Sequence, residues 1–267
     1  MSGLHANASH FDVVIIGGGA AGLMCAFTAG ARGRRVLVIE HSNRIGKKIL
    51  MSGGGRCNFT NLHTTPANFL SGNPHFCKSA LARYTPQDFI ALVQKHRIRY
   101  HEKELGQLFC DDSASDIVEL LRAECERAGV RIVVKCTVVD IAKSDAGFVL
   151  DTSTGPVTAA ALVIASGGLS IPTLGATGFG YDIARQFGHD LRPTRAALVP
   201  FTLGGTERER CAALSGVSLP VRVRCRGVEF TGAMLFTHRG ISGPALLQIS
   251  SYWAPGEVLD VDLLPGI

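Results

Sequence analysis

The pattern of hydrophobic and polar positions at the start of the chain predicts a strand, a helix and a second strand. Continuous apolar runs over 12–16 and 35–39 are typical of buried strands, and 19–32 between them has helical length and composition. Glycines dominate the turn between the first strand and the helix. This order is that of a βαβ unit in a parallel, doubly wound sheet, so we expect an α/β fold.

The pattern continues as α/β beyond a polar, glycine-rich loop that is expected over 41–73. Thr85 is predicted to cap a helix, with Asp88 bonding back to it. The following elements are a hairpin over 100–110, a helix over 113–129, strands over 130–135, 137–142, 147–151 and 161–165, and a helix over 177–188. Together these elements predict a doubly wound sheet with a β-meander inserted late.

A second pattern begins after Pro193. Its predicted elements are strands over 197–203, 220–225, 228–232 and 258–263, and a helix over 244–251. We therefore predict two domains, an α/β domain over 1–194 and a β-rich domain over 195–267. Because the chain stops directly after a strand, we expect the second domain to be incomplete.

The first glycine turn carries a dinucleotide-binding pattern. Gly17, Gly19 and Gly22 fill the positions of G-x-G-x-x-G, where they allow a tight turn, the approach of a pyrophosphate and close helix–strand packing. Ala20 and Ala21 begin the helix whose N-terminus attracts phosphate. The second strand ends in Glu40, about where a carboxylate binds a ribose 2′-hydroxyl. A carboxylate there repels a 2′-phosphate, so the expected dinucleotide is FAD or NAD and not NADP.

Composition and charge narrow the function further. The chain has 267 residues, 46% hydrophobic and 18% charged, with a net charge of +5. Because this charge is mild and the arginines are scattered, we expect no nucleic-acid partner. None of the eight cysteines forms C-x-x-C or a zinc spacing, so we expect reduced core thiols and no metal site. We see no signal peptide and no membrane span, and expect a cytoplasmic protein.

A second glycine-rich segment follows Glu40, the residue that is expected to bind the ribose. Residues 52–58, with the sequence SGGGRCN, place three glycines beside Lys48 and next to Arg56 and Asn58. Successive backbone N–H groups and cationic side chains form concave sites that suit an anion. We expect the pyrophosphate and the ring of a flavin to lie here.

Three motifs resemble one family. The segment 52–61 (SGGGRCNFTN), the segment 165–181 (ASGGLSIPTLGATGFGY) and the segment 235–244 (LFTHRGISGP) are similar to motifs of the BaiN-like flavoproteins, the aminoacetone oxidase family of FAD-dependent oxidoreductases. The resemblance implies a Rossmann FAD domain of the glutathione-reductase type with a β-rich inserted domain. Ala233 departs from the family, which usually has an acidic residue there. Family members also continue beyond this length, so the resemblance implies that this chain is truncated.

The resemblance assigns further cofactor contacts by position. By the resemblance, the glycine turn and Glu40 bind the ADP half of the cofactor. The pyrophosphate and the flavin are contacted by Lys48 and by the loop that contains Ser52, Gly53, Gly54, Arg56, Cys57 and Asn58. Val138 is expected to contact adenine through its backbone, and Ser166, Gly167 and Gly168 to close over the ADP moiety.

The reaction expected from this reading is hydride transfer between NAD(P)H and a small organic substrate through FAD. His238 is a candidate acid–base group, because a histidine in a polar loop titrates near neutral pH. The alternative for His238 is a structural loop histidine that is hydrogen-bonded to the backbone. Cys57 is either a packing residue or a redox thiol whose pKa Arg56 lowers.

Three alternatives stay open at this point. The first alternative is a truncated, non-catalytic fragment that binds a dinucleotide, and the second is a dehydrogenase that uses NAD alone. A flavoprotein that modifies tRNA is the third, and the weak net charge disfavours it. The substrate, the choice between NADH and NADPH, and the oligomeric state are not set by the sequence.

Overall fold

The computed structural model describes residues 9–171 and 175–266, and these fall into two compact units. Unit 1 is Met1–Leu191 and unit 2 is Arg192–Ile267, so the division lies slightly before the boundary that the sequence pattern predicted after residue 194. Pro172, part of one quoted motif, lies outside the described residues.

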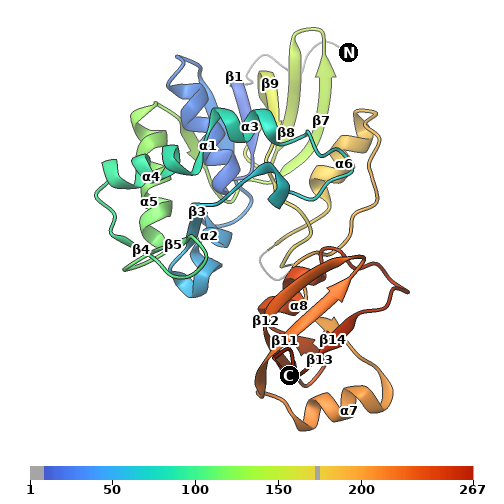
Figure 1. The fold of residues 1–267 in the computed structure, drawn as a ribbon. Coiled ribbons are helices and arrows are strands. Elements are labelled where there is room, and N and C mark those ends of the chain that lie inside the picture. Colours follow the sequence, from blue (N-terminus) through green and yellow to red (C-terminus); the bar gives the residue numbers. More distant parts are fainter. Residues whose placement is uncertain (1–8, 172–174, 267) are drawn as a thin grey trace. The chain divides into compact units, whose positions relative to one another are not determined.

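Unit 1 is built on a six-stranded sheet. Its strands are β1 (Ser9–Ile16), β2 (Val36–Ile39), β6 (Arg131–Val133), β7 (Val138–Ser144), β8 (Gly147–Thr152) and β9 (Val157–Ile164). The order is β6-β2-β1-β9-β8-β7. The first four strands in this order are parallel, and β7, β8 and β9 form the antiparallel meander that was predicted (Figure 1).

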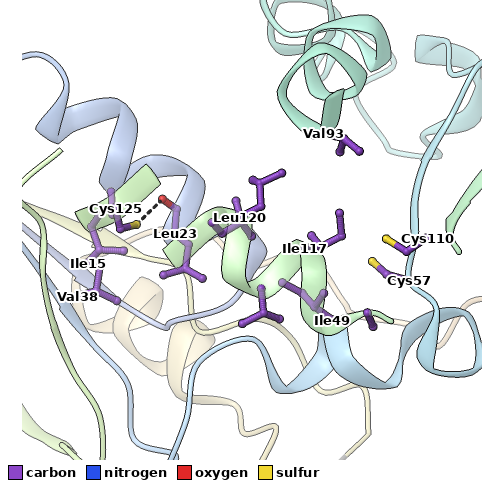
Figure 2. Packing of buried hydrophobic residues seen from close by; sticks show 14 of the residues in the cluster. Ile15, Leu23, Val38, Ile49, Cys57, Val93, Cys110, Ile117, Leu120 and Cys125 are labelled. Atoms are coloured by element: carbon purple, nitrogen blue, oxygen red, sulfur yellow. Dashed lines mark hydrogen bonds between the residues drawn. The ribbon is translucent and has the colours of Figure 1, made fainter. Parts of the chain in front are cut away.

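Helices cover both faces of this sheet because its strands alternate between two apolar cores. Ile15 points into a core shared with α1 (Ala20–Gly30) and α5 (Ser115–Arg127), which pack together. Figure 2 shows part of this core, where Cys125 donates a weak hydrogen bond to the carbonyl of Leu23. Val14 and Ile16 point to the opposite core, against which α6 (Phe179–Gln186) packs. The fold is thus a Rossmann-type α/β sandwich, as predicted.

A smaller layer is inserted between β2 and α5. Its elements are α2 (Lys47–Met51), the short helix η1 (Ser52–Gly55), β3 (Asn58–Asn61), η2 (Pro66–Asn68), α3 (Lys78–Arg83), α4 (Pro86–Lys95), β4 (Tyr100–Glu102) and β5 (Gln107–Cys110). The three strands form an antiparallel sheet in the order β3-β5-β4. The predicted Thr85 cap is confirmed, since Asp88 and Thr85 form a reciprocal capping box.

The expectation of one long loop over 41–73 is wrong. This segment contains α2, η1, β3 and η2. The physical reason is that β3 is stabilised by pairing with β5, which lies far along the chain, so local composition gives no sign of it. The predicted hairpin over 100–110 is confirmed, with Leu105 and Gly106 in the left-handed region at its turn.

Unit 2 is a five-stranded antiparallel sheet with two helices. The strands are β10 (Phe201–Thr202), β11 (Ser218–Cys225), β12 (Val228–Thr237), β13 (Gly240–Ser242) and β14 (Asp260–Asp262), in the order β10-β13-β12-β11-β14. The helices are α7 (Gly205–Ala213) and α8 (Pro244–Ile249). Leu246 and Ile249 of α8 are buried against Val221, Val223 and Met234 of the sheet.

Two predictions for unit 2 need correction. The helix α7 was missed because it is charged and buries only Cys211, so it has no apolar stripe to reveal it. The strand predicted over 228–232 extends to Thr237, and its partner β13 was also missed. Residues 233–237 continue this strand, which pairs with β11 on one side and with β13 on the other.

The cysteines and the membrane-span prediction can be compared with the described chain. All eight cysteines are free and six of them are buried, as expected for core thiols. Within residues 9–171 and 175–266, no helix is long and apolar enough to cross a membrane, and no group of three or more metal-ligating side chains comes together.

Candidate functional site

A cavity of about 450 Å³ opens in unit 1 at the carboxyl ends of β1, β2 and β9. Its walls are the segments that follow these strands, together with α2, the residues before β7 and the start of α6. Ligands of open α/β sheets bind outside the carboxyl ends of the parallel strands, so the cavity lies where the topology expects a ligand.

The glycine turn forms one wall, and its three glycines meet different surroundings. A Cβ on Gly17 would lie 2.3 Å from the carbonyl oxygen of Ala165, and Gly17 has a φ of +113° that favours glycine. A Cβ on Gly22 would lie 1.9 Å from the carbonyl oxygen of Gly17. A Cβ on Gly19 would meet nothing within 4 Å. Gly17 and Gly22 therefore allow close backbone packing, whereas Gly19 leaves open space beside the cavity.

The Glu40 carboxylate is buried at the end of β2 and holds the glycine turn in place. Its Oε2 accepts a hydrogen bond from the backbone N–H of Gly18 at 2.8 Å, and its Oε1 accepts one from the N–H of Ser42 at 2.8 Å. The ring Nδ1 of His41 lies 3.2 Å from Oε1. Each carboxylate oxygen has a second lone pair, so Glu40 can still accept from ribose hydroxyls while it shapes the loop.

Positive charge gathers around the N-terminus of α1. Gly19 is the N-cap with extended backbone, no side chain caps the helix, and its first turn contains no acidic residue. Arg44, Lys47 and Lys48 line the same cavity. The Nζ of Lys48 donates to the hydroxyl of Ser170 at 2.9 Å. Free N–H groups, the helix dipole and three cations make this wall suited to a pyrophosphate.

A second wall follows β9. Ala165, Ser166 and Gly167 line the cavity, and the backbone N–H of Ala165 donates to Ile16 at 2.8 Å. The hydroxyl of Ser166 is buried and has no hydrogen-bond partner among the described residues. Buried polar atoms are usually paired, so this hydroxyl points to a missing polar ligand. Together with the open space at Gly19, it shows that the residues present fit a dinucleotide such as FAD.

The residues before β7 close the far end of the cavity. Cys136, Thr137 and Val138 line it. The backbone N–H of Cys136 donates to the backbone carbonyl of Glu40 at 3.0 Å, so this wall is hydrogen-bonded to the residue that is predicted to bind the ribose. The backbone of 136–138 therefore lies beside Glu40 in the cavity, and its contact with adenine stays a prediction.

Nine of the residues predicted to bind the cofactor line this cavity: Gly17, Gly19, Ala20, Ala21, Glu40, Lys48, Val138, Ser166 and Gly167. Gly22 packs beneath the turn, and a Cβ on Gly168 would meet the hydroxyl of Tyr181 at 3.0 Å. Sequence reasoning missed the lining residues Ser42, Arg44, Lys47 and Thr137, whereas Gly175, Thr177 and Phe179 lie within the 165–181 motif that carried the resemblance. The sequence signal for the first four was only their closeness to residues that were predicted to bind the cofactor.

The second glycine segment lies outside the cavity lining. The residues Ser52, Gly53, Gly54, Arg56, Cys57 and Asn58 do not contribute to its walls. Gly53, Gly54 and Gly55 have φ values of +58°, +65° and +88°, so the segment is a tight left-handed turn. The Ser52 hydroxyl donates to the carbonyl of Ile49 at 2.8 Å. A flavin contact by this loop stays a prediction.

The two residues that were proposed for chemistry, Cys57 and His238, have different surroundings in the structure. Cys57 is buried beside Cys110 in the α1–α5 core (Figure 2), and burial raises the pKa of its thiol, opposed only by a hydrogen bond with Ser52. The expected lowering of this pKa by Arg56 is wrong, because loss of hydration dominates. His238 is exposed in the turn between β12 and β13 of unit 2. Its catalytic role stays untested.

Comparison with known proteins gives one family and several relatives. The profile of the HI0933-like protein Rossmann domain matches residues 11–266. A ribosomal RNA dihydrouridine synthase of Escherichia coli (strain K12) is 56% identical over 96% of this chain, and one of Haemophilus influenzae is 54% identical over 95%. A 3-dehydro-bile acid delta(4,6)-reductase of Clostridium scindens is 33% identical over 91% of the chain.

The chain is shorter than these relatives. It spans 64% of the length of each synthase and 60% of the length of the bile acid reductase.

Proposed function

Because this chain belongs to the HI0933-like family of FAD-binding Rossmann oxidoreductases, we propose that it carries the FAD site of an NAD(P)H-dependent reductase. The substrate proposed is a uridine in ribosomal RNA, whose C5=C6 bond is reduced. The observation that carries the cofactor part is the cavity at the carboxyl ends of β1, β2 and β9, with Gly19 open and Glu40 buried beside it.

The relatives support the type of reaction. The names of the three relatives, two dihydrouridine synthases and a delta(4,6)-reductase, are consistent with one chemistry, in which a C=C bond conjugated to a carbonyl takes up two electrons and two protons. In uridine this is the C5=C6 bond conjugated to the C4 carbonyl. Hydride addition to such a bond suits a reduced flavin, which supplies hydride when bound.

The degree of identity favours RNA over a small molecule. The two synthases are 56% and 54% identical to this chain, against 33% for the bile acid reductase. The expectation of no nucleic-acid partner was drawn from the net charge of +5. That sum is a weak guide, because local clusters of charge and not the total attract a polyanion.

The residues of the chain have separable roles in this proposal. The α1 N-terminus, Lys47 and Lys48 neutralise the pyrophosphate, and Gly19 leaves room for it. Glu40 accepts hydrogen bonds from the adenosine ribose and rejects a 2′-phosphate. The Ser166 hydroxyl, buried and unpartnered among the described residues, gains a partner when the dinucleotide binds. These contacts hold and orient the cofactor, and the hydride comes from NAD(P)H.

A second candidate substrate is a small conjugated enone, favoured by the relative from Clostridium scindens. The protein contacts of the ADP half are the same in both cases. The two candidates differ only in what reaches the reduced flavin, so one assay separates them.

The test supplies the chain with FAD, NADH or NADPH, and either unmodified ribosomal RNA made by transcription in vitro or a 3-keto-4-ene steroid. Nuclease digestion and mass spectrometry then measure dihydrouridine, and chromatography measures the saturated steroid. The proposal predicts dihydrouridine with wild type and none with Gly19→Val. Steroid reduction without dihydrouridine would favour the second candidate. Bound FAD with neither product would assign the chain as a non-catalytic dinucleotide-binding fragment.

A further inference from the structure

One segment of unit 1 has almost no packing partners. From 67 to 84, every residue except Cys77 and Leu81 is exposed, and the helix α3 within this segment buries none of its residues. Phe76 is 80% exposed, Leu70 52% and Phe69 47%. A short helix gains most of its stability from a packed apolar face, so a segment of this kind is expected to gain a binding partner.

The charge around this segment is one-sided. The chain contains 22 Asp and Glu residues, yet none lies between residues 41 and 87. The same stretch contains Arg44, Lys47, Lys48, Arg56, Lys78 and Arg83. None of these six cations forms an ion pair within the described part of the chain.

Several arginines elsewhere are paired. Arg99 pairs with Asp112, Arg122 with two glutamates of α5, and Arg224 with Glu229. The positive charge of the 41–87 stretch is therefore not neutralised, whereas much of the positive charge elsewhere is. The mild net charge of the chain conceals this difference.

We propose that residues 67–83 form the surface that binds the ribosomal RNA substrate, an inference that rests on the proposed function. Unpaired bases of RNA stack on exposed aromatic rings, and Phe69 and Phe76 offer such rings. Lys78 and Arg83 of α3 supply cations for the phosphates. In Figure 1 this segment runs between β3 and α4, with α3 drawn near its end.

The placement along the chain links this surface to the cofactor site. The acid-free stretch begins at the cavity wall, where His41, Arg44 and Lys47 line the cavity. It continues through the second glycine segment to α3 without an acidic residue. A polyanion therefore meets no repelling carboxylate of this stretch between the cofactor cavity and residue 83.

Charge also separates RNA from a second copy of this chain as the occupant. In a symmetric dimer the same patch faces itself, so Lys78 and Arg83 would be brought against their own copies. Burial of unpaired cations against an apolar protein surface is unfavourable. Phosphates neutralise the cations while the bases cover the aromatic rings. Tyr84 marks the edge of the surface, because Asp88 and Glu124 lie near its hydroxyl and raise its pKa along with burial.

The test compares two triple variants of the FAD-loaded chain. The variant Phe76→Ala/Lys78→Ala/Arg83→Ala removes the surface, and Arg131→Ala/Val139→Ala/Lys143→Ala removes the same number of exposed apolar and cationic groups elsewhere in unit 1. The probe is a fluorescein-labelled oligouridylate, measured by fluorescence anisotropy over a range of salt concentrations. FAD content and thermal unfolding verify that both variants fold.

The proposal predicts that the surface variant loses about tenfold or more in affinity, since stacking and two phosphate contacts are removed. The slope of log affinity against log salt becomes shallower by about 1.4, from two contacts at about 0.7 each on a single strand. The control variant keeps both values. A surface variant that binds like the wild type, or a wild type without affinity for RNA, overturns the proposal.

Dihydrouridine formation by the wild type separates this inference from the proposed function. Surface-dependent RNA binding without dihydrouridine keeps the surface and contradicts the reductase assignment. Dihydrouridine formed by a chain whose RNA affinity does not depend on residues 67–83 keeps the reductase and overturns the surface. A surface variant that keeps RNA affinity and loses self-association identifies a protein as the occupant.

Discussion

The two glycine-rich segments of unit 1 have similar composition and different structural reasons for it. In the first, Gly17 and Gly22 are crowded by backbone and only Gly19 faces open space beside the cavity. In the second, Gly53, Gly54 and Gly55 all have left-handed φ values, and the segment lies outside the cavity lining. Close approach of backbone thus explains Gly17 and Gly22, whereas the second segment needs glycine for backbone conformation at all three positions and for space at Gly53.

This difference shows how much can be concluded from the positions of glycines in a sequence motif alone. The spacing G-x-G-x-x-G fixes which glycine must be small for packing and which must be small for a ligand. Three consecutive glycines fix only that the chain turns. The first segment therefore supports an argument about a cofactor, and the second supports an argument about a fold.

The largest effect is expected at Gly22. In Gly22→Ala, the new Cβ would lie 1.9 Å from the carbonyl oxygen of Gly17, so α1 must move away from β1. We expect a loss of about 4 kcal/mol or more in the free energy of unfolding. Urea unfolding measures it. The control Gly129→Ala, at φ +68° with nothing within 4 Å, should lose only about 1 kcal/mol. Equal losses would contradict the packing role of Gly22.

The next effect concerns the ligand and not the fold. Gly19 has an extended backbone that valine tolerates, and its side-chain position is open. Gly19→Val should therefore unfold like the wild type while its FAD affinity falls about 100-fold, or about 2.7 kcal/mol. Fluorescence titration with FAD measures the affinity. An unchanged affinity would place the pyrophosphate elsewhere.

Substitutions in the second glycine segment should lower the stability of the fold, unlike Gly19→Val, which should lower the affinity for FAD. In Gly53→Ala the Cβ would lie 2.7 Å from both the Asn58 nitrogen and the ring of Phe109, whereas in Gly54→Ala it meets nothing within 4 Å. We expect a loss of about 2 kcal/mol for the first and about 1 kcal/mol for the second, which has only its positive φ to overcome. Thermal unfolding with and without FAD measures both. A larger loss for Gly54→Ala would show that space does not set the order.

A smaller loss of stability than at Gly22 or Gly53 is expected at Glu40, which serves the loop and the ligand together. Glu40→Gln leaves one acceptor for the N–H groups of Gly18 and Ser42, so stability should fall by about 1.5 kcal/mol. FAD affinity should fall about tenfold as one ribose contact weakens. Unfolding and FAD titration measure the two losses. A stability loss with unchanged FAD affinity would restrict Glu40 to shaping the turn.

The parts of the fold that depend on local pattern could be predicted. Short local patterns predict the apolar strands β1, β2 and β9, the capping pair Thr85 and Asp88, and the strands of the meander. Elements stabilised by distant partners could not be predicted. β3 pairs with β5 across almost fifty residues of chain, and α7 lacks an apolar stripe.

The site divides in the same way. Gly19 and Glu40 follow from spacing along the chain, and the structure brings both to one cavity. Thr137 and Phe179 reach that cavity from distant parts of the chain, so the spacing of G-x-G-x-x-G gives no sign of them. The burial that raises the pKa of Cys57 is likewise set by tertiary packing, and the neighbouring Arg56 gave a misleading signal.

The most direct measurement is the visible absorption spectrum of the purified chain, followed by anaerobic titration with NADH and with NADPH. The account predicts a yellow protein with one bound flavin, lost in Gly19→Val, whose absorption bleaches when the nicotinamide is added. A colourless chain that folds and takes up no added FAD, or a flavin retained in full by Gly19→Val, would contradict the assignment of this cavity.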